Sequence, residues 1–234
     1  TPNTSTTLAA NSVTFPGSGQ WTVTAGSGVF ADDSNPNTGV SGLSLGTNTF
    51  QWTIDNGPCG STQDQVTIVV YNSAQAAANA GPDQQICTPT TSVTLQGNAA
   101  VAPAVGTWVF ASGTGNISDP NSPTATLSGL SVGTVVLQWV IDNGPCGTTT
   151  DNVTIQIFDG SAPAAAAGPD QSFCTPITGQ VSMLGSSAPA PAVGTWTLVS
   201  GQATIAAPND PFTAITGLGL GANVFQWTVS NGPC

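Results

Sequence analysis

A nine-residue stretch occurs three times in this chain of 234 residues and constrains its fold more than any other feature. The stretch reads QWTIDNGPC at 51–59, QWVIDNGPC at 138–146 and QWTVSNGPC at 226–234. The copies therefore start 87 and then 88 residues apart. A fixed repeat of this length predicts tandem copies of one domain, each about the size of an immunoglobulin-type sandwich.

Apolar and polar residues alternate within each copy, which is typical of half-buried β-strands. In the middle copy, for example, Val135, Leu137 and Trp139 share one face of the strand that leads into NGPC. The alternation predicts seven strands there and an all-β fold, a string of Ig-like β-sandwich repeats of about 87 residues. Every Trp stands inside such a strand, so we interpret all six as core residues: Trp21, Trp52, Trp108, Trp139, Trp196 and Trp227.

The landmarks divide the chain into three expected units, 1–72, 73–159 and 160–234. Thr1-Pro2 aligns with Thr88-Pro89 and with Thr175-Pro176, which directly follow the two AGPDQ runs and their cysteines. We therefore expect the first unit to lack its first strand and the third unit to lack its last. The interpretation is a window from a longer array; the alternative is a subunit that polymerises by exchanging strands.

The charge composition excludes several functions. The chain has no Lys, Arg or His, and its eleven acidic residues give a net charge of −11. Without basic side chains there is no footprint for nucleic acid and no attraction to anionic lipid. Catalysis lacks a His or Lys base, so we expect no enzyme. The sequence has no long apolar run, so we expect no segment that inserts into a membrane.

The acidic residues, all Asp, raise the question of calcium, because carboxylate oxygens suit that ion. Most are explained by turn capping and solubility, and no DxDxDG-type loop occurs. We therefore expect no cofactor and keep calcium only as a weak alternative. Its candidate ligands recur in the repeats: Asp83, Asp170, Asp142 and Asp151.

Five cysteines at repeat-fixed positions predict disulfides and an oxidising, extracellular compartment. They are Cys59, Cys87, Cys146, Cys174 and Cys234. Pairing within a repeat would give Cys87–Cys146 and Cys174–Cys234, and we favour it, although strand polarity argues partly against it. The alternatives join one repeat to the next through Cys87–Cys234, or span each link through Cys59–Cys87 and Cys146–Cys174.

The pattern AGPDQ..C, GTW, GL..G and QW(T/V)(I/V).NGPC resembles the Ig-like and PKD-like tandem repeats of very large secreted surface proteins of Bacteroidota. The Trp-Asp-Phe-Gly-Asp-Gly run of PKD domains is replaced here by Asn-Gly-Pro-Cys, which favours the Ig-like label. The resemblance implies a bacterial cell-surface stalk, adhesin or fibre, and it supplies no binding residue.

Two function classes follow. The first is a structural segment of a long extracellular fibre or stalk, whose partners are neighbouring repeats or copies of the same protein arranged head to tail. The second is an adhesin whose repeats bind a glycan or a partner protein. Binding would need exposed aromatic residues on loops, and only Phe15, Phe30 and Phe212 are candidates. The scarcity of such residues favours the structural class.

Overall fold

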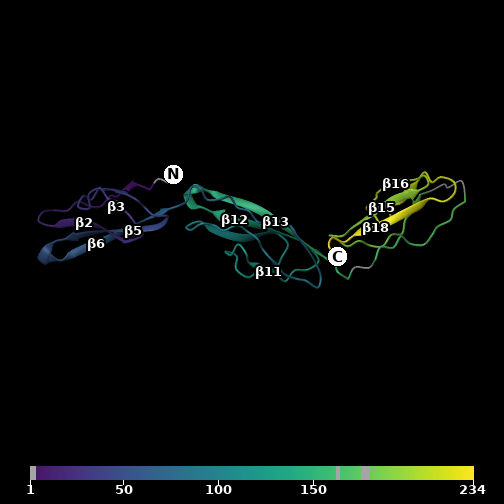
Figure 1. Cartoon of the computed structure of the whole chain (residues 1–234), viewed down its shortest axis with the longest axis horizontal. Coiled ribbons are helices and arrows are strands. Elements are labelled where there is room, and N and C mark those ends of the chain that lie inside the picture. The colour runs from purple at the N-terminus through teal and green to yellow at the C-terminus, as the bar shows by residue number, and fades with distance from the viewer. Residues whose placement is uncertain (1–3, 162–163, 175–179) are drawn as a thin grey trace.

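The structure is a computed structural model that describes residues 4–161, 164–174 and 180–234. Three β-rich units follow one another along the long axis of the molecule (Figure 1). The strands of the middle unit are β7 (Gln84–Cys87), β8 (Val93–Thr94), β9 (Val105–Ser112), β10 (Asn116–Ile117), β11 (Thr126–Ser128), β12 (Gly133–Asp142) and β13 (Thr148–Phe158). The all-β expectation is confirmed, and this unit has the seven strands that its alternation predicts.

The outer units contain fewer strands of the same set. The first has β1 (Thr6–Thr7), β2 (Ser18–Ala25), β3 (Val29–Phe30), β4 (Gly39–Ser41), β5 (Gly46–Asp55) and β6 (Ser61–Val70). The third has β14 (Val181–Ser182), β15 (Val193–Ser200), β16 (Thr204–Ile205), β17 (Ala214–Thr216) and β18 (Val224–Ser230). Thr1-Pro2 and Thr175-Pro176 lie outside the described residues.

Each unit is a sandwich of two sheets. In the middle unit one sheet has the order β7-β13-β12-β9 and the other β10-β11-β8. The strand β7 runs parallel to β13, whereas the other neighbours are antiparallel. The corresponding sheets are β2-β5-β6 in the first unit and β15-β18 in the third. Among the described residues, then, only the middle unit has a first strand paired with a last strand.

A pair of Trp residues fills the centre of each sandwich. In the middle unit Trp108 faces Trp139 across β9 and β12, with ring centroids 4.8 Å apart. Gly106 makes room for them, because a Cβ at this position would collide with the Trp139 ring. The Gly-x-Trp spacing therefore places a bare backbone beside a large ring, and Gly19 and Gly194 do the same in the outer units.

The described chain has three separate hydrophobic cores. Each falls inside one expected unit: the first around Trp21 and Trp52, the second around Trp108 and Trp139, and the third around Trp196 and Trp227. All six rings are at most 5% exposed. The exact bounds of the units, at 72/73 and 159/160, stay a prediction.

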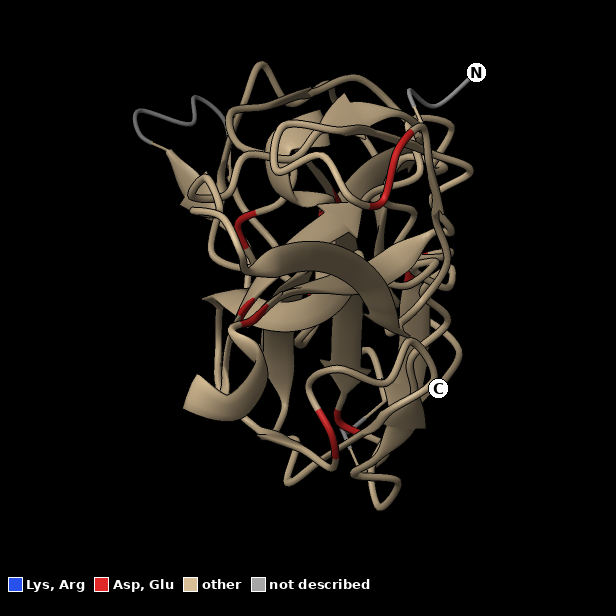
Figure 2. Cartoon of the chain, turned by 90° about the vertical axis from the view of Figure 1, so that its left-hand side faces the viewer, with Lys and Arg blue, Asp and Glu red and all other residues tan. Residues whose placement is uncertain are grey.

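The part of the chain that the structure describes holds only two helical segments, the 3-10 turns η1 (Gly57–Cys59) and η2 (Gly144–Cys146). Neither is long or apolar enough to cross a bilayer. Acidic residues lie at separate points of the ribbon rather than in one cluster (Figure 2).

Candidate functional site: the junctions between repeats

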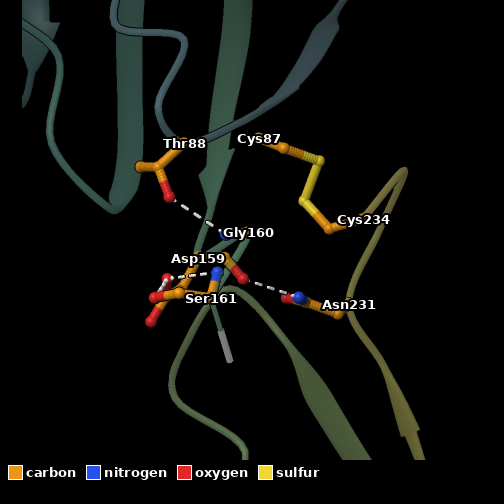
Figure 3. Close-up of a disulfide and its surroundings, with 7 residues drawn as sticks. All are labelled: Cys87, Thr88, Asp159, Gly160, Ser161, Asn231 and Cys234. Carbon is orange, nitrogen blue, oxygen red and sulfur yellow. Dashed lines mark hydrogen bonds between the residues drawn. A yellow bond between two sulfur atoms is a disulfide. The ribbon is translucent and has the colours of Figure 1, made fainter. Parts of the chain in front are cut away.

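The junction between the second and third units joins segments that are far apart in the sequence (Figure 3). Asn231, in the NGPC turn of the third unit, donates from Nδ2 to the carbonyl of Asp159 at 2.9 Å. Gly232 follows with φ +56°, and a Cβ on it would lie 2.5 Å from the Phe158 ring. The Asn-Gly pair thus packs against the end of β13, which explains why the turn keeps both residues.

A disulfide adds a covalent link at the same place. Cys87, at the end of β7, is bonded to Cys234, with the Cα atoms 5.8 Å apart and a sequence separation of 147. The pairing joins one repeat to the next, so the favoured pairing within a repeat, Cys87–Cys146 and Cys174–Cys234, is wrong in this structure.

Strand polarity explains the difference. Cys87 is in register with Phe158 at the end of β13, whereas Cys146 lies just before β13 begins at Thr148. Ten residues of extended strand separate these two ends, about 33 Å at roughly 3.3 Å per residue. A disulfide needs Cα atoms within about 7 Å, so Cys87 cannot reach Cys146 in its own repeat.

The junction between the first and second units is built in the same way. Asn143 donates from Nδ2 to the carbonyl of Asn72 at 2.9 Å, as Asn231 does to Asp159. Gly144 has φ +54°, and a Cβ on it would lie 2.6 Å from the Tyr71 ring. The second and third NGPC turns therefore contact the end of the preceding repeat through equivalent residues.

A polar turn begins the link at the second junction. The amide and the hydroxyl of Ser161 both donate to Oδ1 of Asp159, at 2.9 and 2.7 Å, and the amide of Gly160 donates to Oγ1 of Thr88 at 3.0 Å. The hydroxyl bond from Ser161, followed by its amide bond, holds the pKa of Asp159 below its ordinary value of 3.8. The carboxylate is exposed, so its role here is to shape the turn.

The first strand of the middle unit is held by two of the calcium candidates. Oδ2 of Asp151 accepts from the amide of Ala80 at 2.8 Å, and Oδ1 of Asp83 accepts from the amide of Thr154 at 2.8 Å. Each carboxylate therefore binds the backbone of the partner segment. Sequence reasoning noticed that these residues recur but missed that they fasten the first strand to the last.

The other two candidates lie apart from these. Oδ1 of Asp142 accepts from the amide of Gly144 at 2.9 Å inside the NGPC turn. Asp170 is exposed and accepts no hydrogen bond in the described part of the chain. No group of three or more His, Cys, Asp or Glu side chains converges within the described residues.

The remaining site candidates are cysteines and phenylalanines. Cys59, Cys146 and Cys174 are exposed free thiols. Phe15 is 97% exposed and Phe212 is 61% exposed. Phe30 instead packs on the first core, with its ring centroid 5.6 Å from that of Phe50.

Residues 80–157 match the sequence model of the K319L-like PKD domain family. The match falls on the middle unit, where both the first and the last strand are present. The chain is thus a protein with Ig/PKD-like domains, and the absent Trp-Asp-Phe-Gly-Asp-Gly run is not required for the match. An origin in Bacteroidota stays a prediction.

Among curated proteins, the chain is similar to the dyslexia-associated protein KIAA0319 homolog of Rattus norvegicus, at 27% identity over 217 residues. The match covers 86% of this chain and 20% of that protein, so the chain spans about a fifth of the relative's length.

Among solved structures, the PKD domain of the KIAA 1837 protein is 26% identical, covering 40% of this chain and 97% of that one, with a TM-score of 0.34. The Dpr2 Ig1-Ig2 complex with DIP-Theta Ig1-Ig3 is 11% identical, covering 91% and 88%, with a TM-score of 0.44. Since both scores are below 0.5, the fold is assigned from the chain's own strands and cores.

Proposed function

We propose that this chain is a structural segment of an extracellular surface fibre or stalk built from tandem Ig/PKD-like repeats. The observation that carries the proposal is the Cys87–Cys234 disulfide, which joins one repeat to the next in addition to the polypeptide link. A repeat that only needed stability would gain it from a disulfide within its own fold. A bond between repeats instead fixes their relative placement.

The equivalent hydrogen bonds at the two junctions support the same function. Asn143 and Asn231 each bind the carbonyl at the start of the preceding link, so each repeat is seated on its neighbour in the same way. Because the same contact is used at both junctions, the repeats would form a regular elongated array. A disulfide also suits an extracellular location, since cytosolic reductants keep thiols reduced.

The composition supports a role without catalysis. The chain contains no His, Lys or Arg, and the described residues form no cluster of potential metal ligands. Catalysis by general acids and bases, or by a bound metal, would draw on such groups.

Electron microscopy of the purified chain tests the proposal. We expect straight particles of constant length in which the second and third units keep one orientation under oxidising conditions. The Cys87→Ser variant should show a broader distribution of angles at that junction only. Compact or randomly bent particles of the oxidised wild-type chain would contradict a structural array.

An adhesin is the second candidate, and the exposed Phe15 and Phe212 favour it. The aligned position in the middle unit carries Ala102 in the first case and Thr124 in the second, so neither aromatic residue recurs through the array. A glycan array probed with the wild-type chain and with a Phe15→Ser/Phe212→Ser double variant distinguishes the two functions. Binding that is lost in the variant would establish an adhesin.

A further inference from the structure

The Asn-Gly pair of the NGPC turn is reactive as well as structural. Asparagine is a chemically labile residue, and a following glycine leaves it open to attack by the next backbone nitrogen, because glycine has no side chain to obstruct the approach. Two such pairs lie at the junctions, Asn143-Gly144 and Asn231-Gly232, and Nδ2 of each asparagine donates to a carbonyl of the preceding repeat. The side chain that holds each repeat on its neighbour is therefore one that can change chemically.

The reaction is deamidation, and it needs only water and hydroxide. The glycine nitrogen loses its proton to hydroxide and bonds to Cγ of the asparagine, and the side-chain amide nitrogen takes a proton from water and leaves as ammonia. Water then opens the resulting succinimide ring at one of its two carbonyl groups. One opening gives aspartate, and the other gives isoaspartate, in which the main chain runs through the side-chain carboxyl group.

At the first junction two features oppose this attack. The amide of Gly144 donates to Oδ1 of Asp142 at 2.9 Å. A carboxylate that accepts this N–H favours the protonated nitrogen and repels the negative charge that the attack creates. Asn143 is also only 6% exposed, and its Oδ1 is buried without a hydrogen-bond partner among the described residues. The oxyanion formed on this atom would therefore have no donor to stabilise it.

The second junction lacks the first of these features. Ser230 stands where the middle repeat has Asp142. The amide of Gly232 donates no hydrogen bond to any residue that the structure describes. A neutral hydroxyl does not oppose negative charge as a carboxylate does, so the Gly232 nitrogen loses its proton more readily. Asn231 nevertheless makes the same contact with the preceding repeat.

Deamidation at this position would abolish the contact. Nδ2 of Asn231 lies 2.9 Å from the carbonyl oxygen of Asp159, and a carboxylate oxygen in its place would bring two acceptors together with no proton between them. Isoaspartate would add a methylene group to the main chain and displace Gly232, whose backbone packs on the Phe158 ring. Either product therefore separates the turn from the end of β13.

We propose that Asn231 is a site of spontaneous deamidation that releases the third repeat from its contact with the second, and that Asp142 protects the equivalent Asn143. The Cys87–Cys234 disulfide takes no part in the reaction, so it keeps the two repeats tethered after the contact is lost. Deamidation thus converts a fixed junction into a tethered hinge. The proposal concerns the junctions themselves and holds whether or not the assembled protein is a fibre.

The first test measures the rate at each asparagine in the whole, oxidised chain. The chain is aged in mildly alkaline buffer made with heavy-oxygen water, which labels each product, and is then digested with pepsin at acid pH, where further deamidation is suppressed. Mass spectrometry locates the label. We expect Asn231 to react about tenfold faster than Asn143, since a hydrogen bond to a charged group must be broken only at Asn143. In the urea-unfolded chain the two rates should be similar. Equal rates in the folded chain would overturn the proposal.

Exchanging the preceding residues separates the effect of the carboxylate from the rest of each turn. Ser230→Asp should slow the deamidation of Asn231 several-fold, and Asp142→Ser should speed that of Asn143 by a similar factor. Both positions are exposed at the end of a strand, so the substitutions are compatible with the fold. The rates of the same variants in urea give the intrinsic effect of the neighbouring residue. An unchanged folded-state rate at either position would mean that the carboxylate gives no protection, and the proposal would be wrong.

The structural consequence is tested with a variant that copies the product. Asn231→Asp should broaden the distribution of angles between the second and third units in electron micrographs, while mass spectrometry without reductant shows the disulfide intact. The control Asn37→Asp makes the same change in charge at an exposed position of the first unit and should leave both junctions unchanged. A wild-type distribution of angles in Asn231→Asp would show that the contact does not hold the repeats, and the hinge would have to be abandoned.

Discussion

Removing the disulfide between repeats should destabilise the third unit selectively. When that unit unfolds while the second stays folded, Cys87 remains beside Asp159, because the amide of Thr88 donates to the carbonyl of Phe158. The bond then closes a loop of about 75 residues, worth roughly 4 kcal/mol in the chain-entropy treatment. A sandwich of this size has a stability of about 5–10 kcal/mol, so the Cys234→Ser variant should lose a large share of it.

Urea unfolding followed by hydrogen exchange resolves the three units. With a denaturant slope of about 1.3 kcal/mol per molar urea for a domain of this size, 4 kcal/mol corresponds to a midpoint roughly 3 M lower. The shift should appear in peptides around Trp196 and Trp227 and be absent around Trp21 and Trp52.

The matched controls are Cys59→Ser and Cys174→Ser, which remove exposed free thiols. Neither should move any midpoint by more than a few tenths of a molar. An unchanged midpoint for the third unit in Cys234→Ser would refute the reasoning, as would an equal fall in the first unit, which the disulfide does not touch.

Three further predictions concern the whole array, the core and the junction. Reductant should lower the melting temperature of the chain by more than a chelator does, since the Asp side chains bind backbone amides; collapse by chelator alone in a melting scan would mean that calcium stabilises the fold. Gly106→Val should destabilise the middle unit by about 3 kcal/mol, because the added atoms meet the Trp139 ring. The control Val109→Thr, at an exposed position of the same strand, should cost under about 1 kcal/mol. Urea unfolding measures both. Ser161→Ala should raise the pKa of Asp159 toward 3.8, which NMR titration can follow with Asp32 as the unchanged reference. A pKa that is lowered in the folded state stabilises the fold only at pH values above the unfolded pKa. In the wild type this contribution to stability is therefore lost as the pH falls below about 4.

The sequence contains enough to predict the sandwiches. The Trp residues recur at one step in alternating strands, and a glycine stands at Gly106 because the Trp139 ring occupies the space that a Cβ would need there. Periodicity of this kind is local in origin, so it can be recognised without knowing how the strands are arranged.

The pairing of cysteines depends on the arrangement of the strands, so the sequence left Cys87–Cys234 as one of three alternatives and not the favoured one. Spacing allows several pairings, and only the parallel register of β7 with β13 places Cys87 at the pole that faces the next repeat. The role of Asp151 was hidden for the same reason, because its partner, the amide of Ala80, lies 71 residues away in the sequence. The cysteine pairing and the role of Asp151 both depend on contacts between residues that are far apart in the sequence.

The Cys87–Cys234 bond also determines how tension would travel along such an array. A pull that enters through the first link follows β7 to Cys87 and then crosses directly to Cys234, so the intervening strands are bypassed. Residues 88–233 lie inside the loop that this bond closes, so they carry little of that load while the disulfide is intact. Reduction of the bond would transfer the load to these residues.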